Sequence, residues 1–92
     1  MAVTALALAL GSSASCKTKS MQEQYSEVRR ACRAGDATRA RRMTLEMIEA
    51  SEKFKRLFQD AAADAGGQGI DYCSPFLLVG VEKRIAKADS PD

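Results

Sequence analysis

Residues 36–65, DATRARRMTLEMIEASEKFKRLFQDAAADA, decide the fold, because they form the longest periodic run in the chain. No Pro or Gly interrupts the run, Asp36 is a favoured helix N-cap, and Gly66 is a favoured residue just past a helix end. The sequence therefore predicts one helix of about thirty residues. Apolar residues recur in alternating short steps and predict a stripe that faces the core: Ala40, Met43, Met47, Ala50, Phe54, Leu57 and Ala61.

A shorter helix is predicted before this run. Ser20 and Glu23 have the spacing of a capping box, in which the hydroxyl and the carboxylate satisfy backbone N–H groups at a helix start. Gly35 ends this helix and Asp36 begins the next, so the short connection predicts antiparallel neighbours. The first helix carries its own apolar stripe, which matches that of the long helix: Met21, Tyr25, Val28 and Cys32.

A third helix is predicted after the glycine-rich loop at residues 66–69. Ser74 is a favoured N-cap and Pro75 a favoured first helical residue, so a short helix should run from Pro75 to about Ala88. The apolar run FLLVGV also suits a strand, but the sequence offers no partner strand. Five apolar residues are predicted to face the hairpin: Phe76, Leu77, Val81, Ile85 and Ala88. The predicted fold is all-α, an antiparallel helical hairpin plus a short third helix.

The N-terminal stretch is typical of an export signal. An uncharged apolar run, MAVTALALAL, is followed by small residues up to Cys16. It is shorter than the roughly twenty apolar residues of a membrane-spanning helix, and it lacks the Lys or Arg usual before a signal's apolar core. We predict a signal peptide at residues 1–15 and a single small helical domain at residues 16–92, in the periplasm or cell envelope. The alternative is that residues 2–10 form a native helix packed on the core.

Cys16 is a candidate lipidation site. Residues 13–16, SASC, resemble a bacterial lipobox, in which the Cys becomes the lipidated first residue, but Ser13 replaces the usual large aliphatic residue. Cleavage by the ordinary signal peptidase at the same place is an equal contender. A membrane contact is predicted only through this lipid.

The three cysteines indicate a structural disulfide. Cys16, Cys32 and Cys73 have no C-x-x-C spacing and the chain has no His, which argues against zinc and against a dithiol redox site. In an exported protein Cys32 and Cys73 would pair, joining the end of the first helix to the start of the third. The alternative is three free thiols in a cytosolic protein, with Cys32 simply a core residue.

Composition argues against an enzyme. Ninety-two residues allow one small domain, and without His the chain lacks the commonest general base near neutral pH. Asp60, Asp64 and Asp71 do not have the spacing of a calcium-binding EF-hand loop. We predict no catalytic residues, no metal and no cofactor.

Positive charge gathers around the predicted hairpin turn. Residues 17–42 carry eight Lys or Arg and three Asp or Glu, whereas residues 43–92 carry six and nine. Arg side chains on two helix ends could bind an acidic protein partner or phosphate groups. The simpler interpretation is that these Arg side chains only hydrate the turn. Along the long helix, Glu49 with Lys53 and Glu52 with Arg56 have the order that favours ion pairs. The binding candidates are Arg29, Arg30, Arg33, Arg39, Arg41 and Arg42.

Two short segments resemble those of a known family. The segment ACRAGD at residues 31–36 precedes a helical middle, and YCSP at residues 72–75 follows a glycine-containing loop. This arrangement is similar to the small periplasmic immunity proteins that neutralise type VI secretion amidase effectors, in which an aromatic-Cys-x-Pro motif opens the last helix. The chain lacks the further Cys and the Gly-Tyr-x-x-Gly element of that family. The resemblance implies an exported, disulfide-tied helical scaffold that neutralises an effector.

These observations predict a small exported helical protein that acts by protein binding in the cell envelope, of the inhibitor or immunity type. The alternative is a cytosolic or phage-encoded helical protein that binds nucleic acid, or regulates, through the Arg residues. Nucleic acid is the less favoured partner because the protein is predicted to lie outside the cytoplasm.

Overall fold

The computed structural model describes residues 19–67 and 69–89. Four helices occupy this part of the chain, and none of the described residues lies in a strand, so the predicted all-α class is confirmed. No described helix is long and apolar enough to cross a membrane. The helices are α2 (Met21–Arg33), α3 (Ala37–Ala50), α4 (Glu52–Asp64) and α5 (Pro75–Asp89).

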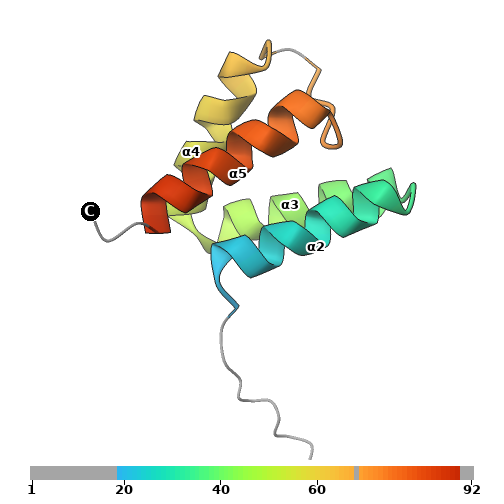
Figure 1. The fold of residues 1–92 in the computed structure, drawn as a ribbon, viewed down its shortest axis with the longest axis horizontal. Coiled ribbons are helices and arrows are strands. Elements are labelled where there is room, and N and C mark those ends of the chain that lie inside the picture. The colour runs from blue at the N-terminus through green and yellow to red at the C-terminus, as the bar shows by residue number, and fades with distance from the viewer. Residues whose placement is uncertain (1–18, 68, 90–92) are drawn as a thin grey trace, which may run out of the picture.

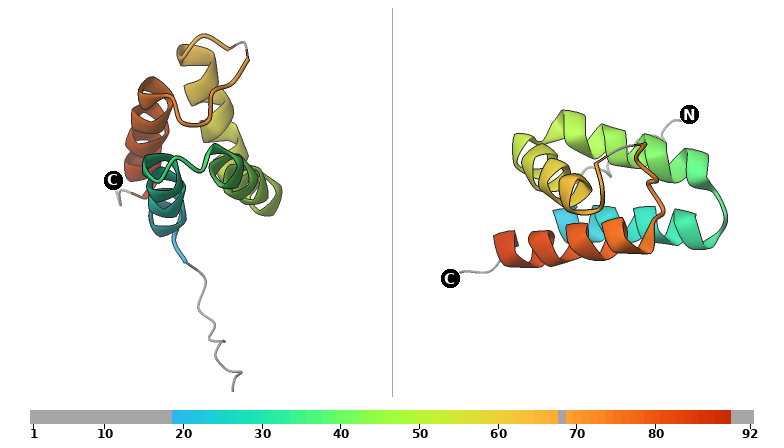
Figure 2. Two further views of the ribbon diagram at one scale, coloured as in Figure 1. Left: turned by 90° about the vertical axis from the view of Figure 1, so that its right-hand side faces the viewer. Right: turned by 90° about the horizontal axis from the view of Figure 1, so that it is seen from above.

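The helices form two antiparallel pairs (Figure 1). The first pair, α2 and α3, is the predicted hairpin, and the second consists of α4 and α5. Helix α5 also packs against α2, so the start of α5 lies near the end of α2 (Figure 2). This arrangement buries one core between the pairs, to which all four helices contribute.

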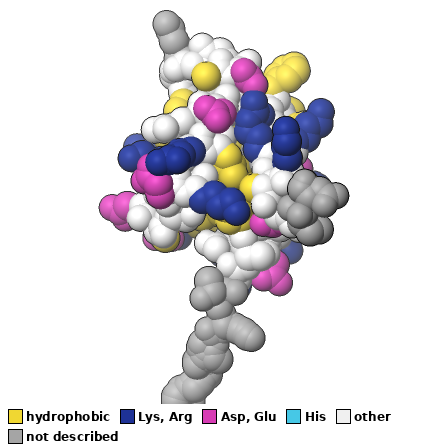
Figure 3. Space-filling view, turned by 90° about the vertical axis from the view of Figure 1, so that its left-hand side faces the viewer, with side chains coloured by type: hydrophobic (Ala, Val, Ile, Leu, Met, Phe, Trp, Pro, Cys, Tyr) yellow, Lys and Arg dark blue, Asp and Glu magenta, His cyan; other side chains and the backbone are white. Residues whose placement is uncertain are grey.

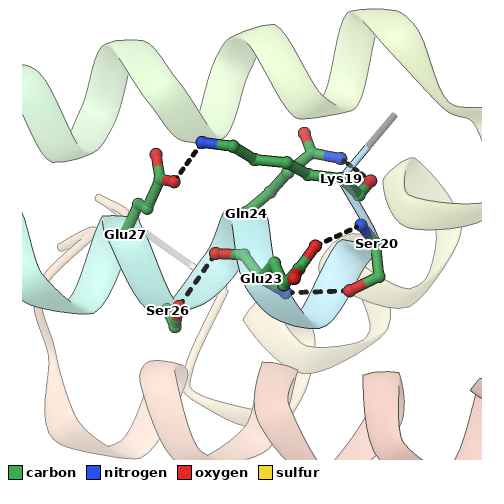
Figure 4. Close-up of polar contacts among 6 residues, drawn as sticks. All are labelled: Lys19, Ser20, Glu23, Gln24, Ser26 and Glu27. Carbon is green, nitrogen blue, oxygen red and sulfur yellow. Dashed lines mark hydrogen bonds and ion pairs between the residues drawn. The ribbon is translucent and has the colours of Figure 1, made fainter. Parts of the chain in front are cut away.

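Local signals in the sequence account for the hairpin. The Ser20 hydroxyl accepts a hydrogen bond from the Glu23 N–H, and the Glu23 carboxylate accepts one from the Ser20 N–H, so the capping box is present (Figure 4). At the other end of α2, Gly35 has a φ of +78°. Its N–H reaches the Cys32 carbonyl, and the Asp36 N–H reaches the Ala31 carbonyl. This pair of bonds ends the helix, and glycine suits it because its φ is positive.

The predicted single helix over residues 36–65 is wrong, because the chain breaks at Ser51. Ser51 has extended backbone angles (φ −143°, ψ 116°), and its hydroxyl accepts a hydrogen bond from the Phe54 N–H at 3.1 Å. Ser51 therefore ends α3 and caps α4. The break also separates Glu49 from Lys53, so the predicted pair within one helix does not form, whereas Arg56 and Glu52 do pair at 3.4 Å within α4.

Replacing Ser51 by Ala is expected to lower the free energy of unfolding by about 1 kcal/mol, because the first N–H groups of α4 would lose their side-chain acceptor. Ser26→Ala is the matched control, since the Ser26 hydroxyl only donates to the Glu23 carbonyl on the exposed side of α2. The control should change stability by less than about 0.5 kcal/mol. Urea unfolding measures both, and equal losses would contradict the capping role of Ser51.

A row of aromatic rings runs through the core. Tyr25 on α2 lies 6.0 Å from Phe54 between ring centroids, Phe54 lies 5.9 Å from Phe58, and Phe58 lies 5.9 Å from Tyr72. Tyr72 directly precedes Cys73, so the row reaches the loop that leads to α5. Tilted or offset rings at these separations attract one another beyond the area that they bury. The row therefore ties α2, α4 and this loop together.

The predicted core stripes are mostly buried, with two exceptions. Ala50 is exposed, because it lies directly beside the break at Ser51. Phe76, predicted to face the hairpin, is 83 % exposed. In α5 the buried residues are Leu77, Val81 and Ile85, and a residue one position before this stripe is turned about 100° around the helix.

Thr44 is a core residue that the apolar pattern did not include. It is buried between apolar neighbours in α3, and its hydroxyl donates to the Ala40 carbonyl at 2.8 Å. Because that bond satisfies the hydroxyl within the helix, Thr44 does not leave an unpaired polar group in the core.

Candidate functional site

Cys32 and Cys73 form a disulfide, as the cysteine pattern predicted. The sulfurs lie 2.12 Å apart and the Cα atoms 5.5 Å apart, and the bond joins residues separated by 41 positions. Asp71 supports this junction, because its carboxylate accepts a hydrogen bond from the Cys73 N–H at 3.0 Å. The bond links the last turn of α2 to the turn that opens α5, which begins at Pro75.

The predicted signal peptide and the lipidation candidate Cys16 lie outside the described residues. Cleavage, lipidation and export therefore stay predictions.

The six Arg candidates do not form one cluster. Arg29 is half-buried and pairs with Glu82 of α5 at 2.5 Å, so it joins two helices rather than facing solvent freely. The Tyr25 ring is buried, and burial together with the charge of Glu82 raises the pKa of its hydroxyl, an effect that Arg29 opposes. Among the candidates, Arg29 therefore has a clear structural role.

The other five Arg side chains are exposed, and some of them gather along the α2–α3 pair. Arg39 and Arg42 of α3 line a hollow of about 490 Å³ together with Lys19, Glu27 and Glu46. The remaining exposed Arg residues are Arg30, Arg33 and Arg41. Because both carboxylates and cations line this hollow, its charge is mixed rather than purely basic.

Glu27 is the centre of this mixed group. Lys19 bonds its carboxylate across one face of α2, and the Gln24 amide holds the Lys19 carbonyl at 2.9 Å (Figure 4). The Lys19 hydrogen bond lowers the pKa of Glu27, and the nearby charges of Lys19, Arg30 and Arg39 lower it further, while slight burial acts in the opposite direction. Glu27 is thus a carboxylate that the surrounding cations keep ionised.

Because the pKa of Glu27 is lower in the folded state than in the unfolded chain, its contribution to stability is present at neutral pH. That contribution should disappear as the pH falls through the folded-state pKa, since the carboxylate then takes up a proton in both states. Glu27→Gln should therefore reduce stability slightly near pH 7 and have almost no effect near pH 2. Urea midpoints of the two proteins at both pH values test this, and a loss that grows on acidification would contradict it.

The acidic residues Asp64 and Asp71 have structural partners, Arg84 and the Cys73 N–H. Asp64 pairs with Arg84 of α5, and the described residues contain no group of three or more side chains suited to hold a metal ion. Among the described residues, Asp60, Asp64 and Asp71 therefore do not come together as a group that could hold a cation.

Sequence reasoning missed one exposed apolar surface. Phe76 is 83 % exposed and Val79, one turn further along α5, is 49 % exposed. Both line a hollow of about 500 Å³ between α4 and α5. Aligning α5 on its buried stripe of Leu77, Val81 and Ile85 would have placed Phe76 and Val79 on the side of the helix that faces away from the core.

Comparison of the chain with protein-family models, with curated proteins and with solved structures finds no match.

Proposed function

We propose that this chain is a small exported protein of the cell envelope that acts by binding another protein. The observation that carries the proposal is the Cys32–Cys73 disulfide. Structural disulfides form and persist in oxidising compartments and are rare in the cytosol. The disulfide and the signal-like N-terminus are separate features of the chain, and each supports export to an oxidising compartment.

Protein binding is favoured over other functions because of what the surface offers. A large aromatic side chain at 83 % exposure is costly to leave in water, and exposed apolar groups beside a hollow are typical of protein interaction sites. The inhibitor or immunity type is proposed from the resemblance alone. The YCSP segment that carries this resemblance leads directly into α5.

Fractionation of the native host tests the export part of the proposal. We expect the protein in the periplasmic or membrane fraction, and we expect a variant without residues 2–15 to stay in the cytoplasm. Cys16→Ala separates the two forms of export: a lipoprotein would move from the membrane to the soluble periplasmic fraction, whereas an ordinary secreted protein would not move. Full-length protein in the cytoplasm would overturn the proposal.

Nucleic-acid binding through the Arg residues is the alternative function. The geometry supports it less, because Arg29 is paired with Glu82 and because Glu27 and Glu46 lie in the same hollow as Arg39 and Arg42. We expect binding to DNA or RNA to be weak, non-specific and lost at physiological salt, since phosphate contacts weaken steeply as salt rises. Sequence-selective binding that survives physiological salt would reverse the ranking.

A further inference from the structure

The α4–α5 pair carries two adjoining surface hollows. One hollow, of about 500 Å³, lies at the start of α5, and a second, of about 470 Å³, lies at its end. Arg84 lines both, so the two hollows adjoin at the Arg84–Asp64 ion pair. We call this surface the α4–α5 groove.

The floor and one wall of the α4–α5 groove are apolar. Ala61 of α4, Ala65 at its C-terminal cap and Gly80 of α5 are small, which leaves room between the helices. Phe76 and Val79 line the same hollow. At the other end the apolar residues are Leu57 and Ala88. Figure 3 shows apolar side chains between groups of Lys and Arg on the side of the molecule where α5 ends. The groove thus has the apolar centre and charged rim of a protein-binding site.

The rim has an excess of positive charge. Five cationic and three anionic side chains line the two hollows. Arg56 pairs with Glu52 and Arg84 pairs with Asp64, so two cations are already neutralised within the protein. The other three, Lys53, Lys83 and Lys87, make no ion pair with any described residue, and only one further carboxylate, that of Asp60, lines the groove.

We infer that the α4–α5 groove binds an acidic amphipathic helix of a partner protein. Such a helix would place its apolar face on the floor beside Phe76 and its carboxylates toward Lys53, Lys83 and Lys87. Helix α4 is 13 residues long, so the groove accommodates a helix of about four turns. This inference rests on the proposed protein-binding function and names the surface and the chemistry of the partner.

Two other occupants fit less well. A second copy of this chain that presented the same groove would place the excess of positive charge against itself. An anionic membrane would meet three carboxylates within the groove, and a flat bilayer cannot follow a hollow between two helices. A partner helix of opposite charge avoids both conflicts.

The test uses a fluorescent synthetic peptide of about 14 residues, with Leu at helical spacing on one face and Glu on the flanks. The matched peptide carries Lys in place of every Glu. Titrated into the purified protein, the acidic peptide should bind with a Kd below about 1 mM, and the basic peptide at least about tenfold more weakly. NMR shift changes should centre on Phe76, Val79 and Lys83.

Variants locate the site. Phe76→Ala should weaken acidic-peptide binding by about tenfold or more, as expected for an exposed aromatic anchor. Leu45→Ala is the matched control, because Leu45 is also exposed (37 %) but lies on α3, outside the groove, and it should leave binding unchanged. Gly80→Ala adds a methyl group to the floor, 3.6 Å from the Ala61 Cβ and 3.4 Å from an Arg84 guanidinium nitrogen. It should weaken binding without lowering the melting temperature, since Ala favours a helix more than Gly.

Several results would overturn the inference. These are no binding at about 1 mM peptide, equal binding of the two peptides, or no effect of Phe76→Ala. Binding of phosphatidylglycerol vesicles without binding of the acidic peptide would indicate a membrane surface. A dimer that Phe76→Ala dissociates would indicate a second copy. The titration uses purified protein, so failed export in the host would leave its result unaffected, and its failure would leave export untouched.

Discussion

Phe54→Ala is expected to lower the free energy of unfolding by about 3–5 kcal/mol, because it removes the central ring of the core. Phe54 is fully buried, and its ring lies between those of Tyr25 and Phe58. The cavity would face both helix pairs, so neither pair could close it alone. A loss of this size is a large part of the stability of a domain of this length.

The matched control is the same substitution at an exposed position. Phe76→Ala removes an equal side chain, but Phe76 is 83 % exposed, so stability should change by less than about 0.5 kcal/mol. If Phe54→Ala does not fold at all, Phe54→Leu should give a smaller, measurable loss. Urea unfolding compares the three variants, and similar losses at positions 54 and 76 would show that the core is not where we place it.

Reduction of the Cys32–Cys73 disulfide is the second large effect. The bond closes a loop of 41 residues, and the chain-entropy model gives a stabilisation of about 4 kcal/mol for a loop of this length. The melting temperature should therefore fall by roughly 15 °C or more on reduction. Cys16 is replaced by Ser in every sample, so that it cannot exchange with the disulfide.

The control for reduction is the double variant Cys32→Ser/Cys73→Ser. Its melting temperature should match that of the reduced protein, and reducing agent should not lower it further. A protein that melts at the same temperature with and without reducing agent would contradict a stabilising role for the bond.

The sequence predicted those features that depend on local signals. The capping box at Ser20, the Gly35-Asp36 junction and the Ser74-Pro75 start each act within a few residues, and each appears in the structure where the pattern predicted it. The disulfide was predictable because the hairpin and the returning third helix bring Cys32 and Cys73 to the same end of the molecule.

The spacing of the apolar residues did not indicate the break at Ser51. Met47 and Phe54 are seven residues apart, close to two helical turns, so the apolar stripe keeps its phase across the break and resembles one helix. A Ser three residues before an apolar residue is a cap signal only when something else favours a break. Here a tertiary effect, the packing of α4 against α5, decides between one long helix and two shorter ones.

The exposed apolar surface was missed for a related reason. Phe76 and Leu77 are adjacent and both apolar, so hydrophobicity alone does not say which faces the core. The structure buries Leu77 and exposes Phe76. The binding role of the Arg residues, proposed from their density in sequence, also depends on neighbours that the sequence did not identify, such as Glu82 beside Arg29.

Intact-mass measurement of the protein from its native host tests the central claim most directly, that this is an exported, disulfide-tied helical protein. We predict a chain that begins at or near Cys16, with or without a lipid on that residue. We also predict a mass lower by two hydrogen atoms than that of the reduced form, from the Cys32–Cys73 bond. A mass that corresponds to the chain from Met1 or Ala2, with three free thiols, would contradict this claim.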